Sequence, residues 1–512
     1  MRKRRLLSAA ALVVAVTVAI TACTSTATDD EESTESPTLR IGSSAAPESF
    51  DPAELSLGVE IPQFWMLTYD TLLKLNADGT VSPNLATEWS YDESNTKLEV
   101  TLRDDVTFTD GAPLNAEAVK ANIEHIQAGA GRDKAYADAI AATNVVDDFT
   151  VEFELSEPDP MLLTNLARNI GAVGSPEALT TEAIKTTPVG SGPYILDTAA
   201  TVVGSNYTYD RNPDYWNSEA WPYDRIELLV YTDLTARVNA LKAGQVDATW
   251  IDGSTAAEVE ASGLTVTSSP AEWVGMKIND RAGAVVPALG DLRVRQAINM
   301  AFDSQAMLEN IDLGFGSLTN VTVLPGSNGF VEALQGTYEY DPDGARKLLA
   351  EAGYPDGFDL PMPQFPFRAA YNPTIESALG DIGIRVIWKD FAPTETVQQL
   401  YDPTNAMFMT ALNGARESWD FYSSAVTPDA SGNIAQSTDP ELEALLDTAR
   451  SSSEEDREQA NQAVQTWLVE NAWFAPWYYR DTVYATSDAV TFEPQFGDAL
   501  PLISTFAPAN SK

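Results

Sequence analysis

Histidine and cysteine, two side chains that often carry nucleophilic and metal chemistry, each occur once in the 512 residues, as His125 and Cys23. One cysteine cannot form an intrachain disulfide, and a thiolate metal site takes about two to four ligands. A Ser-His-Asp or Cys-His mechanism would depend on His125 alone. The motifs Gly-x-Ser-x-Gly and Gly-x-x-x-x-Gly-Lys-Ser/Thr do not occur. We therefore expect no metal, no cofactor and no catalysis, and a hydrolase with a carboxylate pair is the enzymatic alternative.

The segment that contains His125, NAEAVKANIEHIQ, predicts a helix. Asn115 is a suitable N-cap, because its side chain can accept a hydrogen bond from the first helical turn. The apolar residues that recur at helical spacing are Val119, Ile123 and Ile126. His125 lies beside this stripe, so we expect it to be structural or solvated.

The residues around Cys23 resemble a bacterial lipoprotein signal. Residues 2–5 are basic, and the apolar run 6–20 is shorter than the roughly 20 residues that cross a bilayer. Ile20-Thr21-Ala22-Cys23 matches the lipobox, which implies cleavage after residue 22 and a diacylglycerol on the Cys23 thiol. The alternative is an ordinary secretory signal with an incidental cysteine.

A polar segment, residues 23–37, follows the signal and is rich in Ser, Thr, Asp and Glu. Such a segment has too little apolar surface to offset the entropy of ordering, so we expect a disordered acidic tether. Together, signal and tether predict an extracytoplasmic protein that is lipid-anchored to the outer face of the cell membrane.

The remaining composition is that of a folded, acidic protein. The chain has 75 acidic and 31 basic residues, a net charge of −44, and 44% hydrophobic residues with 11 Trp. The charge excludes nucleic acid as a partner, because the phosphates would be repelled. The length allows two or three domains.

Alternating and helical patterns predict a mixed α/β chain. Leu98, Val100 and Leu102 alternate with polar residues, which indicates a half-buried strand within a pair over residues 97–109. The apolar segment 61–75 predicts a helix. Asp291 and Asp341 are placed to cap two further helices with buried faces.

Several segments stand out when they are taken in their order along the chain. They are ESFDPAE, PNLATEWSYDESNTKLEVTLRDDVTFTDGAPLNAEAVKANIEHI, PVGSGPYIL, YDRNPDYWN, ARVNALKAGQVDA, DLRVRQAINMAFD and YDPDGARKLLAEAGYPDG. Together they resemble one family, the extracytoplasmic solute-binding proteins of ABC importers (family 5, the oligopeptide, dipeptide and nickel branch), and the resemblance covers nearly all of residues 39–511.

The resemblance implies an α/β fold of the periplasmic-binding-protein type II class, with two lobes around a cleft and an extra inserted domain. Two chain crossings, near residues 275–279 and 485–486, would form the hinge. The implied domains are lobe I (38–78, 188–275 and 485–512), the inserted domain (79–187) and lobe II (276–484).

The resemblance also implies where a ligand would bind. Peptide-binding members meet the ligand carboxylate with an Arg shortly before Tyr-Asn-Pro, and FRAAYNP makes Arg368 the matching residue. In the dipeptide group an Asp binds the ammonium group, and here Ala415 stands at that position. The candidate ligand-binding residues are Arg368, Tyr371, Asn372, Arg416, Glu417, Trp419, Asp420 and Tyr422.

Glu417 or Asp420 could still receive an amine, and Trp419 and Tyr422 could either stack on a ligand or pack in the core. We therefore expect a monomeric binding protein that delivers peptides, or a related polar oligomer, to ABC permease subunits with their ATPases. A non-peptide ligand such as an oligosaccharide is the alternative within the family. The nickel branch fits poorly, since no histidine lies in this region.

Overall fold

The computed structural model describes residues 37–509 apart from 59, 132 and 499. The predicted signal, Cys23 and nearly all of the predicted tether lie outside the described residues. Within the described residues, no helix is long and apolar enough to span a bilayer.

A nine-stranded sheet runs through the described chain in the order β16-β12-β17-β11-β1-β10-β9-β8, with β13 paired to β17. The two longest strands, β12 and β17, pair antiparallel along their length. The strands are β1 (Thr38–Ser43), β8 (Tyr194–Leu196), β9 (Asn206–Arg211), β10 (Arg225–Val230), β11 (Ala248–Ile251), β12 (Thr265–Ile278), β13 (Gly316–Leu318), β16 (Met407–Asn413) and β17 (Phe474–Thr486).

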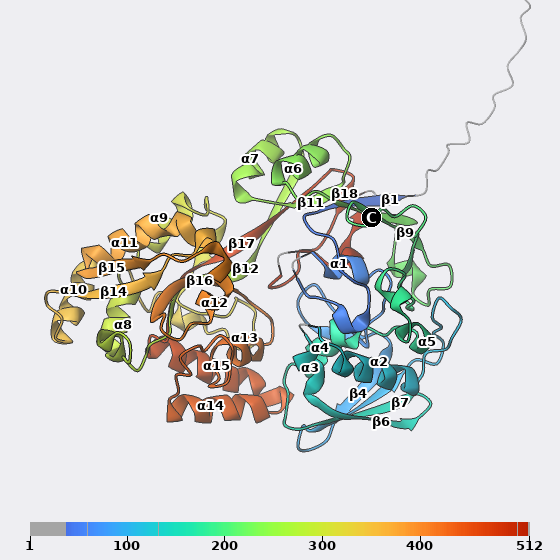
Figure 1. The fold of residues 1–512 in the computed structure, drawn as a ribbon, viewed down its shortest axis with the longest axis horizontal. Coiled ribbons are helices and arrows are strands. Elements are labelled where there is room, and N and C mark those ends of the chain that lie inside the picture. Colours follow the sequence, from blue (N-terminus) through green and yellow to red (C-terminus); the bar gives the residue numbers. More distant parts are fainter. Residues whose placement is uncertain (1–36, 59, 132, 499, 510–512) are drawn as a thin grey trace, which may run out of the picture. The chain divides into compact units, whose positions relative to one another are not determined.

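The strands β12 and β17 connect two groups of elements, as Figure 1 shows. The end of β17 pairs with β11, and the end of β12 pairs with β16. We call the elements on the β11 side the first lobe and those on the β16 side the second lobe. The predicted crossings lie in or directly after these strands, and the domain limits remain a prediction.

The ladder between β12 and β17 is interrupted at Pro270. Pro270 pairs with Asp481 and Glu272 pairs with Arg480, so one extra residue lies in β12 at a β-bulge. Proline also lacks the N–H that a ladder hydrogen bond needs. The connection between the lobes is therefore irregular at this point.

The first lobe packs its part of the large sheet around a core that includes Ile41, Trp65, Tyr209 and Ile226. The segment that we predicted as one helix over 61–75 is different in the structure. It contains the short helix α1 (Pro62–Trp65), a turn, and the strand β2 (Leu73–Leu75), which pairs with β3 (Val81–Pro83).

A separate four-stranded sheet, in the order β4-β5-β7-β6, packs against helix α2 (Ala116–Ala128). The Asn115 side chain accepts a hydrogen bond from the N–H of Ala118, so the predicted cap is confirmed. Leu98, Val100 and Leu102 are buried, but β5 pairs with β4 and β7 and not with residues 103–109. The strands are β4 (Ala86–Tyr91), β5 (Lys97–Leu102), β6 (Ile140–Asp147) and β7 (Thr150–Leu155).

The second lobe covers β12, β16 and β17 with helices and carries a parallel strand pair, β14 (Phe358–Pro363) and β15 (Ile384–Lys389). Asp291 and Asp341 cap α8 and α10 as predicted, by accepting from the N–H groups of Arg293 and Gly344. The main helices are α8 (Leu292–Asn299), α9 (Ser304–Asn310), α10 (Pro342–Glu351), α11 (Asn372–Asp381), α13 (Trp419–Ala425), α14 (Pro440–Ser451) and α15 (Glu454–Glu470).

Candidate functional site

A cavity of about 490 Å³, which we call the hinge cavity, lies where the two lobes meet β12 and β17. The first lobe contributes the end of β11 and the start of α7 (Gly253–Ala261). The second lobe contributes residues 311–315, Phe367 and Arg368, and the connecting strands contribute Glu272 and residues 480–483. A ligand in this cavity would touch both lobes.

Arg368 brings an unmatched positive charge to the hinge cavity. It lies on a short 3₁₀ helix (Pro366–Tyr371), and burial lowers the pKa of its guanidinium. Among the described residues it has no ion pair, and its Nε is buried without a hydrogen-bond partner. A half-buried cation that forms no ion pair has a desolvation cost that a bound anion would offset.

The charges next to Arg368 are already matched. The guanidinium of Arg480 donates to Glu272 from Nε at 2.8 Å and lies 3.5 Å from Oδ1 of Asp312. The hydroxyls of Tyr371 and Tyr478 donate to Oδ2 of Asp312 at 2.7 and 2.5 Å. This network fixes the cavity wall and leaves Arg368 outside it.

The predicted residues Tyr371 and Asn372 follow Arg368 in the chain but do not line the hinge cavity. Burial raises the pKa of Tyr371 to about 12, and its ring stacks on Trp477 at 6.2 Å between centroids. The Nδ2 atom of Asn372 is buried and has no hydrogen-bond partner among the described residues. Tyr371 therefore supports the wall through Asp312, while Asn372 has an unused donor.

Arg416 lies away from the hinge cavity. Its Nη1 is 3.4 Å from the carbonyl oxygen of Asp78, and its side chain is exposed. The structure therefore does not bring Arg416 together with Arg368.

Glu417 is held inside the second lobe. It accepts hydrogen bonds from Nδ2 of Asn328 at 2.8 Å and Nδ2 of Asn461 at 3.0 Å, and Arg457 lies 3.8 Å away. Burial raises the pKa of Glu417. Because these amides occupy its oxygens, Glu417 is not free to receive an amine.

Trp419 and Tyr422 belong to the core of the second lobe, with exposed fractions of 7% and 0%. The Tyr422 hydroxyl donates to the carbonyl oxygen of Asn461 at 2.8 Å. Of the two roles left open by the sequence, these positions favour packing over stacking on a ligand. Asp420 is half-buried in the first turn of α13 and does not line the hinge cavity.

The sequence reasoning missed Glu272, Asp312, Arg480 and Asp481, which also line the hinge cavity. A signal was present for two of them. The adjacent pair Arg480-Asp481 is the only charged part of the segment APWYYRDTVYA. Charged residues in such an apolar strand need partners or a ligand.

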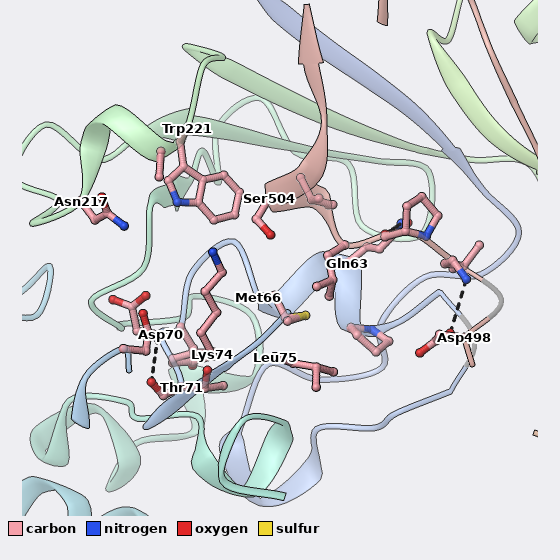
Figure 2. A pocket seen from close by; sticks show the side chains of 18 of the residues that line it. Gln63, Met66, Asp70, Thr71, Lys74, Leu75, Asn217, Trp221, Asp498 and Ser504 are labelled. Atoms are coloured by element: carbon pink, nitrogen blue, oxygen red, sulfur yellow. Dashed lines mark hydrogen bonds between the residues drawn. The ribbon is translucent and has the colours of Figure 1, made fainter. Parts of the chain in front are cut away.

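A second cavity, of about 190 Å³, lies in the first lobe between α1, Trp221, Asp498 and residues 500–504 (Figure 2). Lys74 extends into it. At its edge, Asp70 accepts hydrogen bonds from Tyr215 at 2.9 Å, Trp216 at 3.1 Å and Ser191 at 3.1 Å. Burial raises the pKa of Asp70 to about 6. The second cavity contains none of the predicted site residues.

Comparisons with known proteins agree with this architecture. The glutathione-binding protein of Salmonella typhi is 31% identical over 307 residues, 57% of each chain, so the match spans little more than half of that relative. Di/tripeptide-binding protein 3 of Pseudomonas aeruginosa is 26% identical over 455 residues, 81% of this chain and 84% of the relative.

Solved structures support the fold. HbpA2 from Haemophilus parasuis matches with a TM-score of 0.82 at 22% identity, covering 92% of this chain and 99% of that chain. A Helicobacter pylori binding protein in complex with the peptide STSA matches with a TM-score of 0.72 at 20% identity, covering 92% and 98%. The family model for bacterial extracellular solute-binding proteins, family 5, matches residues 80–433. This match extends over more than half of the chain, which therefore belongs to the family 5 extracellular solute-binding proteins.

Proposed function

We propose that this protein captures a peptide, or a related polar oligomer, in the hinge cavity and delivers it to the membrane subunits of an ABC importer. One observation carries the proposal. In a chain with 75 acidic residues, Arg368 lines an interlobe cavity and forms no ion pair among the described residues. A free carboxylate could accept two parallel hydrogen bonds from its guanidinium.

The placement of the cavity suggests how binding would be signalled. Its walls come from both lobes, so a bound ligand would favour the arrangement in which those walls are close. The permease subunits would recognise that arrangement. The ligand would leave unchanged, and the protein would act as a monomer.

Trp419 and Tyr422, the rings that the sequence offered for stacking on sugars, are buried in the second lobe. Trp250, Phe315 and Phe367 do line the hinge cavity, so the preference for peptides rests on Arg368 and not on the aromatic residues. The relatives whose names mention glutathione and di- or tripeptides add support for a ligand with a carboxylate.

Calorimetry with a short peptide and its C-terminal amide tests the proposal. Wild type should prefer the free acid. Arg368→Ala should weaken binding of the acid by about 10- to 200-fold, since a charge-assisted contact contributes roughly 1.5–3 kcal/mol. Arg368→Lys should restore only part of the loss, because an ammonium lacks the planar fork.

Arg416→Ala is the matched control, because Arg416 is an arginine of the same lobe that lies outside the hinge cavity. It should leave both affinities unchanged. Equal affinity of wild type for acid and amide would remove Arg368 as a carboxylate clamp and make the non-peptide ligand the better hypothesis.

Two further experiments test the anchor and the absence of catalysis. Cys23→Ala should release the protein to the medium or leave it unprocessed, and retention on carbonate-washed membranes would contradict lipid attachment. A peptide incubated with the pure protein should be recovered intact by mass spectrometry. Product in excess of the protein would instead favour a carboxylate-pair hydrolase.

A further inference from the structure

The C-terminal segment that follows β18 (Val490–Thr491) leaves the first lobe and then returns to it. Near its two ends, Phe492 packs against the core of the first lobe and Leu500 belongs to that core. Phe496, in the middle, packs against the core of the second lobe instead. We call residues 493–498 the strap. The strap joins the two lobes at a place separate from the strands β12 and β17.

The ring of Phe496 lies between two glycines that belong to different lobes. Gly79 is in the turn after β2 of the first lobe, and Gly326 is in the second lobe. A Cβ atom at Gly79 would lie 3.3 Å from Cδ1 of the ring, and one at Gly326 would lie 3.0 Å from Cε2. These two ring atoms are on opposite edges of the ring. Phe496 is therefore in close contact with the backbone of both lobes.

The backbone of the strap is also held from both sides. The N–H of Phe496 donates to the carbonyl oxygen of Ala77 in the first lobe at 2.7 Å. At Gly497, a Cβ atom would lie 2.4 Å from the carbonyl oxygen of Gly414, which directly follows β16 in the second lobe. A residue with a side chain could not approach so closely, and the φ of 67° at Gly497 also favours glycine.

A cavity of about 400 Å³ lies beside the strap. The first lobe contributes Ala77 and Asp78 to its lining, the second lobe contributes Leu324 and Pro325, and the strap contributes residues 493–496. The two lobes are therefore not packed against each other on this side of the strap. The strap is a local contact, and releasing it would not require a continuous core to be opened.

We propose that the strap is a latch that holds the two lobes in the observed arrangement when no ligand is bound. The ribbon of β12 and β17 connects the lobes, and a rotation about it would pull the Phe496 ring away from one of its two glycines. That movement would expose apolar surface to water, so the ring opposes it. The lobes would then need less of a ligand's binding energy to stay together. The latch acts without a ligand, so its test does not depend on the proposed peptide function.

Small-angle X-ray scattering of the purified protein without added peptide tests the latch. A compact chain of this length has a radius of gyration of roughly 23 Å, and Phe496→Ala should raise the measured value by about 1 Å or more, because the lobes separate. Phe492→Ala is the matched control. Phe492 is a half-buried ring of the same segment, but it contacts Tyr484 and Phe506 and packs in the first lobe. This control should keep the wild-type radius even if its melting temperature falls.

Phe496→Met is a second variant, which carries the test if Phe496→Ala does not fold. Methionine keeps an apolar side chain but lacks the flat ring that fits between Gly79 and Gly326, so we expect a smaller increase in the same direction. A wild-type radius in each Phe496 variant that unfolds cooperatively on heating would overturn the latch. An equal increase in Phe492→Ala would also overturn it, because the effect would then come from the core of the first lobe and not from the contact between the lobes.

Discussion

The two cavities differ in whether the buried charged residue at each has bonding partners within the protein. In the second cavity, Asp70 accepts hydrogen bonds from three side chains. In the hinge cavity, Arg368 forms no ion pair among the described residues, and the nearby Glu272 and Asp312 are engaged by Arg480. A buried polar group whose hydrogen bonds are made within the protein stabilises the fold. A buried charge without an ion pair destabilises it until a ligand supplies the partner. We therefore assign Asp70 to stability and Arg368 to binding.

The largest effect that this comparison predicts is on stability. Asp70→Ala removes the acceptor for Tyr215, Trp216 and Ser191 and leaves their donors buried. Each stranded donor costs about 1–3 kcal/mol, so the free energy of unfolding should fall by more than about 3 kcal/mol. Differential scanning calorimetry measures the loss, and an unaltered melting temperature would contradict the structural role.

The pH dependence of stability gives a second, slightly smaller effect. The pKa of Asp70 is about 6 in the folded protein, above its unfolded value of about 3.9. The folded state therefore holds the proton more tightly, and the contribution of Asp70 is greatest below about pH 4 and is lost as the pH rises through 6. The full change is about 3 kcal/mol.

Other acids titrate in the same range, so the measurement is the difference between wild type and Asp70→Asn. Wild type should gain stability relative to the variant as the pH falls from 7 to 4. A constant difference across this range would show that burial does not raise the pKa as stated.

The stability of the protein should respond differently when the hinge cavity loses the charge of Arg368. Arg368→Met removes an unpaired cation and keeps an unbranched apolar side chain, so the ligand-free protein should be as stable as wild type or more stable by up to about 1 kcal/mol. Thermal unfolding without ligand measures this. A clear loss of stability would mean that Arg368 has a structural partner and would weaken the comparison.

The smallest effect is expected at Lys74, which extends into the second cavity (Figure 2). If peptides bind only in the hinge cavity, Lys74→Ala should change the peptide affinity by less than about twofold, or about 0.4 kcal/mol. Calorimetry with the same peptides provides the value. A tenfold loss would instead make the second cavity part of the ligand site.

Local signals in the sequence predicted the elements whose boundaries depend on nearby residues. The caps at Asn115, Asp291 and Asp341 are confirmed because a cap bond joins residues two or three apart. The prediction of one helix over 61–75 was wrong, because the first part of this apolar run forms a short helix and the last part forms a strand. Periodicity cannot separate these two elements in short apolar runs.

The candidate site was harder to predict because its parts are distant in sequence. Arg368 was predicted as a ligand-binding residue from the Tyr-Asn-Pro that follows it. Its lack of an ion pair could not be predicted, because it depends on Arg480 forming ion pairs with Glu272 and Asp312. Conversely, Glu417 and Tyr422 are near Ala415 in sequence and still face the interior of the second lobe. Closeness in the sequence therefore predicted which segment lies near the site, but it did not predict which side chains of that segment face the cavity.

The bulge at Pro270 has a mechanical consequence. An antiparallel pair of strands resists bending through its ladder of hydrogen bonds, and Pro270 cannot donate one. A second irregularity lies between Val274 and Gly275, where Gly275 pairs with Pro476. The stiffness of the β12–β17 ribbon should therefore be lowest between residues 270 and 275. Ala271 and Glu272 of this stretch line the hinge cavity, so a ligand bound there would press on the part of the ribbon that bends most easily.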